Sequence, residues 1–196
     1  MKKSVKTLVL ITTSFLIFGY ARAQLKLLPG GGIGSDIKKV VTAYPNHFSS
    51  ITGDQIEEDL QSASYECTFN AAGAEKTTIS RYSAKANNVY SWQALMLTSE
   101  DFDKARQKFR ALYNQLNNLS VSTGPSAGGN LQGTYESPAE EKKFTSVVFS
   151  IKTGDETLRK VKVELSIEFY EPMEWRVKVL VYDREREDNE RGREKE

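Results

Sequence analysis

The chain has only one cysteine among its 196 residues. Because Cys67 has no second thiol to pair with, no intramolecular disulfide can form, and the core alone must hold the fold together. Cys67 alternates with polar neighbours on the apolar side of a short run, and no cationic residue flanks it to stabilise a thiolate. We therefore expect a buried and unreactive thiol.

Histidine is equally scarce, since His47 is the only one. A lone histidine could act as a general base or a metal ligand. Here no Cys, Asp or Glu accompanies it at metal-ligand spacing, and no nucleophile motif is present. The carboxylates lie in turns, at helix starts and on strand exteriors, where they are ordinarily solvated. The sequence therefore offers no catalytic, cofactor-binding or metal-binding residue and implies no cofactor, and His47 is interpreted as an ordinary surface residue of a loop.

The chain also lacks an apolar run of the length that crosses a bilayer comfortably. The basic start at Lys2 and Lys3, the apolar run 8–18 and the small residues Ala21 and Ala23 instead predict a cleaved secretory signal over residues 1–23, with an uncleaved anchor as the alternative. No cysteine follows the run, which argues against a lipid anchor. We expect export to the periplasm or beyond the cell, and no transmembrane segment in the mature chain.

An excess of positive charge is missing as well. Removal of residues 1–23 takes away four basic side chains and leaves 23 basic against 26 acidic ones, a net charge of −3. Proteins that bind nucleic acid ordinarily present a basic surface to the phosphates. Nucleic acid is therefore not an expected partner.

What the chain does contain is a strong strand signal in residues 158–182. Val161, Val163 and Leu165 alternate with charged residues, and the same alternation resumes at Trp175 after a short turn. Two such runs predict an antiparallel hairpin, to which residues 144–152 add a third strand. A shift of the strand register by one residue would expose the apolar side chains to water, so the register of the hairpin is tightly specified.

The rest of the chain contains helical and strand periodicities in turn. One helix is expected from its cap Ser35 to the residue before Pro45, and another over residues 102–116 with Thr98 as its cap. The remaining segments are expected to be strands at 65–69, 77–83 and 89–97, an edge strand at 131–135, a loop or short helix at 53–62 and an irregular stretch over 120–143.

These elements predict one α+β domain over residues 35–183. It has an antiparallel sheet of about six strands with two helices packed on one face, in the order α-β-β-β-α-(β)-β-β-β. Residues 24–34 are interpreted as a flexible leader rich in glycine, because they lack the Lys-Ser/Thr pair of a phosphate-binding P-loop. The polar residues 184–196 are interpreted as a disordered charged tail, with a helix formed on a partner as the alternative.

Three short stretches lie on either side of the expected helix over 102–116: Tyr44-Pro45-Asn46, Tyr90-Ser91-Trp92 and Trp175-Arg176-Val177. In this order they resemble stretches of small uncharacterised exported proteins of Gram-negative bacteria, and the resemblance covers most of residues 35–183. It implies export and a similar fold. It implies no activity and no site residues.

Two functions stay open. The first is a non-enzymatic binding domain of the bacterial envelope whose partner is a protein or another envelope component. An outward face that mixes charge with Tyr170, Leu180 and Tyr182, the long segment 120–143 and the charged tail suggest it. The second is a small periplasmic or secreted hydrolase that uses a pair of carboxylates as general acid and base. Because no such pair stands out, the sequence favours a binding domain that is not an enzyme.

Overall fold

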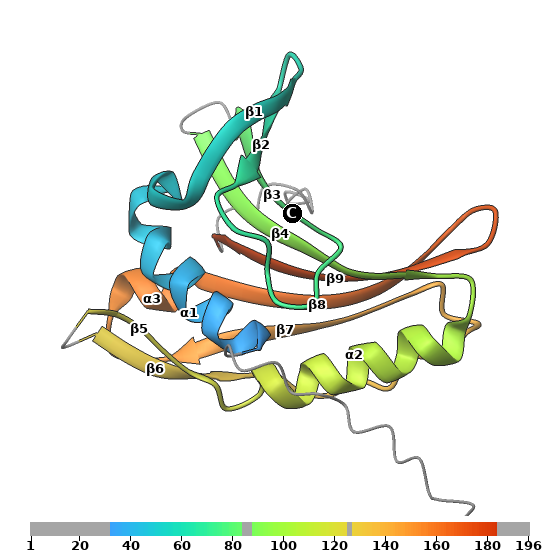
Figure 1. Cartoon of the computed structure of the whole chain (residues 1–196). Helices are drawn as coiled ribbons and strands as arrows, with labels where there is room; N and C mark the ends of the chain where they lie inside the picture. The colour runs from blue at the N-terminus through green and yellow to red at the C-terminus, as the bar shows by residue number, and fades with distance from the viewer. Residues whose placement is uncertain (1–31, 84–87, 125–126, 184–196) are drawn as a thin grey trace, which may run out of the picture.

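The computed structural model describes residues 32–83, 88–124 and 127–183. These residues form one antiparallel sheet with helices packed against it (Figure 1). The strand order is β1-β2-β3-β4-β9-β8-β7-β6-β5, so the last strand of the chain is at the centre and β1 and β5 are the two edges. The strands are β1 (Thr52–Glu58), β2 (Ser62–Cys67), β3 (Lys76–Ser83), β4 (Asn88–Ser99), β5 (Ser120–Gly124), β6 (Ala127–Gln132), β7 (Phe144–Lys152), β8 (Val161–Tyr170) and β9 (Glu174–Asp183).

The described residues also contain three α-helices and two 3-10 turns. They are α1 (Ile33–Ala43), η1 (Tyr44–Asn46), η2 (Ser49–Ile51), α2 (Phe102–Leu116) and α3 (Glu156–Lys160). With nine strands and three helices in the described part of the chain, the expected arrangement of about six strands and two helices is wrong. Residues 53–62 contain strand β1 instead of a loop or short helix, residues 120–143 contain β5 and β6, and the turn after β7 contains α3.

The sequence analysis did not predict strand β1 because β1 lies at the edge of the sheet. Most of its residues are exposed, among them Asp54, Glu57 and Glu58, so burial imposes no alternation of apolar and polar residues. Its pairing with β2 is also irregular, with shifts of register on both sides of Gln55. A charged and irregular edge of this kind resists pairing with another chain.

The sequence analysis did not predict β5 and β6 as strands because glycine-rich segments ordinarily mark turns. In β6, however, Gly129 lies directly against β7. A Cβ atom at this position would come within 2.5 Å of the carbonyl oxygen of Lys152, a distance that real Cβ atoms do not adopt. Only a residue without a side chain fits such a close approach of two backbones. The glycine is therefore a condition for the pairing of β6 with β7.

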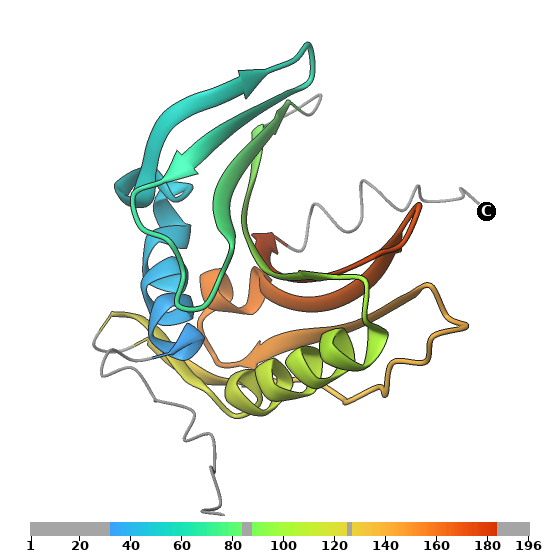
Figure 2. The ribbon, with the colours of Figure 1, turned by 45° about the vertical axis from the view of Figure 1, so that its right-hand side comes forward.

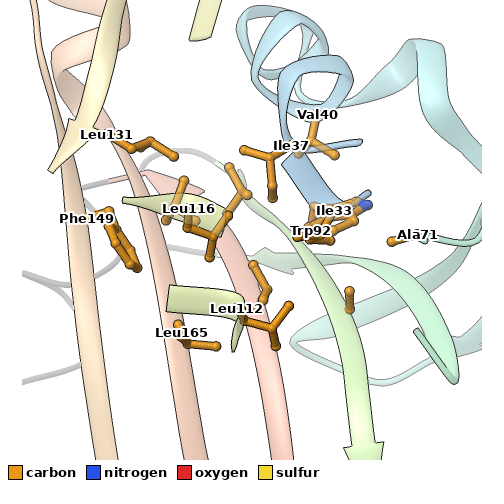
Figure 3. Close-up of a cluster of buried hydrophobic side chains, with 14 of the residues drawn as sticks. Ile33, Ile37, Val40, Ala71, Trp92, Leu112, Leu116, Leu131, Phe149 and Leu165 are labelled. Atoms are coloured by element: carbon orange, nitrogen blue, oxygen red, sulfur yellow. The ribbon is translucent and has the colours of Figure 1, made fainter. Parts of the chain in front are cut away.

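Helices α1 and α2 lie on the same face of the sheet and enclose the core with it (Figure 2). Figure 3 shows Ile37 and Val40 of α1 and Leu116 of α2 gathered between Trp92 of β4 and Phe149 of β7. All five side chains are fully buried. Burial of an apolar side chain of this size contributes roughly 1.5–3 kcal/mol before the loss of entropy is counted. The apolar faces of both helices are thus the main cover of the sheet.

The expected C-terminal meander is confirmed. Strands β7, β8 and β9 pair antiparallel in sequence order. Val163 lies opposite Val181 and Leu165 lies opposite Val179, and all four side chains are buried on the face that the helices cover. This register keeps every apolar side chain of the alternation inside.

Both long helices begin with other caps than expected. Gly32, rather than Ser35, precedes the first turn of α1. The cap of α2 is Asp101 rather than Thr98, and its carboxylate accepts a hydrogen bond of 3.1 Å from the backbone N–H of Lys104. Helix α1 therefore begins before the expected cap Ser35, and the cap of helix α2 lies three residues after the expected cap Thr98.

Strands β4, β8 and β9 run between two different ends of the molecule. At one of them, which we call the closed end, the ring of Trp175 lies 4.8 Å from the ring of Phe102 and 5.1 Å from that of Phe169. Trp175 is only 4% exposed. These rings join the start of α2 to β8 and β9. The turn between β8 and β9 lies on the right of Figure 1. We call the opposite end, where β4 and β8 begin and β9 finishes, the pocket end.

Part of the expected organisation lies outside the described residues, namely the secretory signal (1–23), residues 24–31 of the leader and the tail (184–196). All the strands fall within residues 35–183, the expected domain. No helix in the described part of the chain is both long and apolar enough to cross a membrane.

Candidate functional site

A pocket of about 690 Å³ lies at the pocket end of the sheet. Four segments that are distant in the sequence form its walls: the turn after α1, the start of β4, helix α3 and the end of β9. They meet on the left of the molecule in Figure 1. Pockets that bind small molecules have volumes of roughly 300–1,000 Å³, so this one is of a suitable size.

The turn after α1 places two neighbouring side chains in opposite surroundings. His47 and Phe48 both have a left-handed backbone, with φ of 53° and 59°, which is costly for residues with large side chains. The conformation is held because the backbone N–H of Phe48 donates a 3.0 Å hydrogen bond to the carbonyl of Ala43 and because the Phe48 ring is 1% exposed. Phe48 thus anchors the turn in the core and leaves His47 exposed at the pocket.

His47 is not isolated in the fold. Its imidazole stacks on the ring of Tyr90 from the start of β4, with ring centroids 5.0 Å apart and an angle of 30° between the planes. Tyr90 is half-buried, whereas His47 is exposed, so much of the imidazole stays open to the pocket. The imidazole makes no hydrogen bond with another described residue. The two rings therefore form an aromatic wall.

The end of β9 contributes a carboxylate that the fold holds in place. The hydroxyl of Tyr44 donates a hydrogen bond to Oδ2 of Asp183. Tyr44 is only 9% exposed, so the contact connects the turn after α1 firmly to the end of the central strand. Both residues line the pocket. The Asp183 carboxylate is thereby fixed at the pocket wall.

Helix α3 adds further polar groups. The Asp155 carboxylate caps it by accepting a 2.8 Å hydrogen bond from the backbone N–H of Leu158, whose side chain is fully buried. This cap and this anchor fix a helix that is too short to be stable alone. Its side chains Glu156, Thr157 and Lys160 line the pocket.

Charges of both signs meet in the pocket. Two carboxylates, Glu156 and Asp183, share it with the ammonium group of Lys160 and with the neutral polar groups of Asn88 and Thr157. In the described residues, no group of three or more His, Cys, Asp and Glu side chains could hold a metal ion. The pocket can therefore stack its aromatic wall against a ring of a ligand and can form several hydrogen bonds with that ligand.

The face of the sheet opposite the helices was the other surface that the sequence suggested. Tyr182 on this face is 5% exposed, and Tyr170 and Leu180 are half-buried. Neighbouring strands cover them: the guanidinium of Arg176 lies 4.1 Å from the Tyr170 ring centroid, and the Tyr182 hydroxyl donates to Glu164 at 3.1 Å. Cross-strand contacts of this kind are ordinary on a solvated sheet face.

Large apolar side chains are exposed at only a few of the described positions, namely Ile56, Leu60, Phe144 and Met173. The first two belong to the β1–β2 hairpin and the last two lie at the closed end. Protein-binding surfaces commonly present one contiguous apolar patch of several hundred Å². These four residues are too scattered to form one.

No protein-family model, no curated protein and no solved structure matches this chain. The resemblance to small exported proteins of Gram-negative bacteria therefore stays a prediction, and the candidate site rests on the geometry of its residues. Cys67, expected to be buried, is half-buried in β2.

Of the pocket residues, the sequence analysis weighed His47 alone as a catalytic or metal-binding residue, whereas Tyr44 and Tyr90 stood only in the stretches that carry the resemblance. The partners of His47 were missed because they come from separate segments, and Tyr44 and Asp183, for example, are 139 positions apart. Periodicity carries no information about such a meeting. One local signal was present, because Asp155 stands three residues before Leu158, the spacing of a helix cap and an apolar anchor. This spacing could have predicted α3, which the sequence analysis interpreted as a turn, but it could not have predicted the neighbours of α3 in the pocket.

Proposed function

We propose that this protein is a non-enzymatic binding domain of the bacterial envelope and that the pocket at the pocket end binds a small polar envelope component. The observation that supports this function is the convergence of an aromatic wall and several polar groups on one pocket of about 690 Å³. Small-molecule sites combine ring surfaces with a few well-placed polar groups in the same way. Export to the envelope rests on the signal pattern of residues 1–23.

A small ligand is favoured over a docked protein for two reasons. The exposed large apolar side chains of the described residues are scattered, so they give a protein partner little to cover. On the face opposite the helices, charged groups already pair with each other, as Lys178 does with Glu168 at 3.3 Å and Arg176 with Glu174 at 2.9 Å. In the pocket, Glu156 also pairs with Arg159, at 3.2 Å, but here charged and neutral polar groups surround a volume of about 690 Å³ that a small molecule can enter.

The alternative function is hydrolysis by a pair of carboxylates, and one observation favours it: Glu156 and Asp183 line the same pocket. Two others argue for binding. Asp183 accepts a hydrogen bond from the Tyr44 hydroxyl, so this carboxylate already has a structural partner. The imidazole of His47 is held by ring stacking and not by a carboxylate that would orient it as a general base.

A thermal-shift screen of the exported protein tests the proposed function. A bound ligand at about 100 times its Kd stabilises the folded state by about 2.7 kcal/mol. We expect at least one class of small polar compound to raise the melting temperature of the wild type and of Met173→Ala, an exposed control at the closed end. The same compound should leave Tyr90→Ala, which loses the aromatic wall, unshifted. A screen without any hit, or an equal shift in Tyr90→Ala, would contradict the proposal.

Product analysis separates binding from hydrolysis. The compound that binds is incubated with the protein and analysed by mass spectrometry. We expect it to be recovered intact. A product that forms with the wild type and disappears in both Glu156→Gln and Asp183→Asn would replace the binding function with the hydrolase.

A further inference from the structure

The aromatic wall of the pocket is built to meet the flat side of a ring. The stacked pair of His47 and Tyr90 is fixed from two directions, by a strained turn anchored through Phe48 and by strand β4. Side chains held in this way lose little entropy when a ligand packs on them. An aromatic face is electron-rich and attracts the slightly positive C–H groups of a ring. The ligand is therefore expected to present such a ring.

The charges of the pocket limit the net charge of that ligand. The two carboxylates, Glu156 and Asp183, are balanced by the ammonium group of Lys160 and by the guanidinium of Arg159, which lies 3.2 Å from Glu156, so these four groups give neither an anion nor a cation a net attraction. A neutral ligand with hydroxyl groups meets no repulsion, because carboxylates accept hydrogen bonds from hydroxyls and an ammonium donates to them. Asn88 and Thr157 extend the set with groups that both donate and accept.

We propose that the ligand is a neutral saccharide whose ring packs against the His47–Tyr90 pair while its hydroxyl groups bond to the surrounding polar side chains. A pyranose ring presents C–H groups on its faces and hydroxyl groups around its edge, which is the combination that the pocket requires. The inference rests on the proposed function and specifies its ligand class. It assigns Tyr90 to stacking, and Asp183 and Glu156 to hydroxyl recognition.

Three sugars that share one ring and differ in charge test this directly: glucose, glucuronic acid and glucosamine, with N-acetylglucosamine as a second neutral probe. Each is titrated into the full protein at pH 7 and followed by isothermal calorimetry or ligand-observed NMR. We expect a neutral sugar to bind with a Kd in the millimolar range or tighter, about 4 kcal/mol or more. It should bind at least tenfold more tightly than either charged analogue.

Variants of the wall and the carboxylates refine the test. Tyr90→Ala should weaken binding of the neutral sugar at least tenfold, whereas Tyr90→Phe, which keeps the ring, should stay within about threefold of the wild type. Glu156→Gln should narrow the preference for glucose over glucuronic acid, because it removes one carboxylate and leaves the positive charge of Arg159 without its partner Glu156. Circular dichroism of each variant establishes that it is folded.

Three outcomes would overturn the inference: no binding of either neutral sugar, tighter binding of a charged analogue, or binding that Tyr90→Ala leaves unchanged. The proposed function can survive such a failure. If the thermal-shift screen finds another small polar compound whose effect Tyr90→Ala abolishes, the pocket is a binding site and only its ligand class was wrong.

Discussion

The two ends of the sheet are built from similar kinds of residue but differ in how these residues pack. At the closed end the rings of Phe102, Phe169 and Trp175 touch each other and fill the space between strand and helix. At the pocket end the rings of His47 and Tyr90 touch each other but border a volume of about 690 Å³. Aromatic contacts thus stabilise one end and leave the other available.

The difference suggests that the closed end contributes mainly to stability and the pocket end mainly to binding. The closed end joins the start of α2 to the central hairpin, so its side chains contribute to the core. The pocket end is fixed by local devices instead, namely the anchor Phe48, the cap Asp155 and the contact of Tyr44 with Asp183. Changes at the closed end should therefore unfold the protein, and changes at the pocket end should alter what it binds.

The largest effect is expected from Trp175→Ala. The side chain is 4% exposed and contacts two other rings, so its loss leaves a cavity and should lower the free energy of unfolding by about 3–5 kcal/mol. Urea denaturation measures it. The comparison variant is Tyr90→Ala, a half-buried ring at the pocket end, which should cost about 1 kcal/mol. Equal losses for the two variants would remove the distinction between the ends.

The next largest loss of stability is expected where β6 pairs with β7. Gly129→Ala places a Cβ atom 2.5 Å from the Lys152 carbonyl oxygen and should cost about 1–3 kcal/mol, because the two strands must separate. Gly124→Ala is the matched control, since no atom lies within 4 Å of its added Cβ. It should change stability by less than about 0.5 kcal/mol. Denaturation midpoints that agree for both variants would contradict the close approach of these strands.

Asp155→Ala tests whether the short helix α3 shapes the pocket. Loss of the cap should cost about 1 kcal/mol and should also weaken ligand binding, because α3 carries three of the pocket side chains. Asp155→Asn keeps a capping side chain and should preserve both properties. Calorimetric binding and thermal melting of the two variants check this. Unchanged binding in Asp155→Ala would show that α3 is dispensable for the site.

The smallest effect is a pH dependence at the cap of α2. The hydrogen bond from the Lys104 N–H holds the pKa of the Asp101 carboxyl below its ordinary value. Because the folded state binds this proton less tightly than the unfolded state, the carboxylate stabilises the fold above its unfolded pKa and loses this contribution as the pH falls through its folded pKa. Asp101→Asn caps without a charge.

The wild type should therefore melt at a higher temperature than Asp101→Asn. This difference in melting temperature should be largest near neutral pH and should shrink below about pH 4. Thermal melts between pH 7 and pH 2 measure it. A difference that stays constant over this range would mean that the charge of Asp101 plays no part in capping.

The sequence predicts those parts of the fold in which burial dictates a pattern. Strands β7, β8 and β9 alternate because one of their faces is dry, and helix α2 repeats its apolar residues because one stripe meets the sheet. Strand β1 has no such constraint at the edge of the sheet. In β6, Gly129 satisfies a steric condition set by β7, which no local reading reveals.

The candidate site was even less accessible from the sequence. His47 drew attention as the only histidine, but its meaning depends on the stack with Tyr90, and this contact exists only after β4 has joined the sheet. The contact of Tyr44 with Asp183 likewise requires the whole fold between them. From the residue types alone, His47 was therefore interpreted as an ordinary surface residue, although the fold places it at the wall of a pocket.

The most direct test of the account is an NMR titration of the ¹⁵N-labelled protein with glucose and N-acetylglucosamine. We predict that amide signals from residues 44–48, 88–90 and 156–160 shift progressively and that those from 169–175, at the closed end, stay in place. Shifts confined to the closed end or to the face of the sheet opposite the helices, or no shift with either sugar, would contradict the claim that the pocket end is a saccharide site.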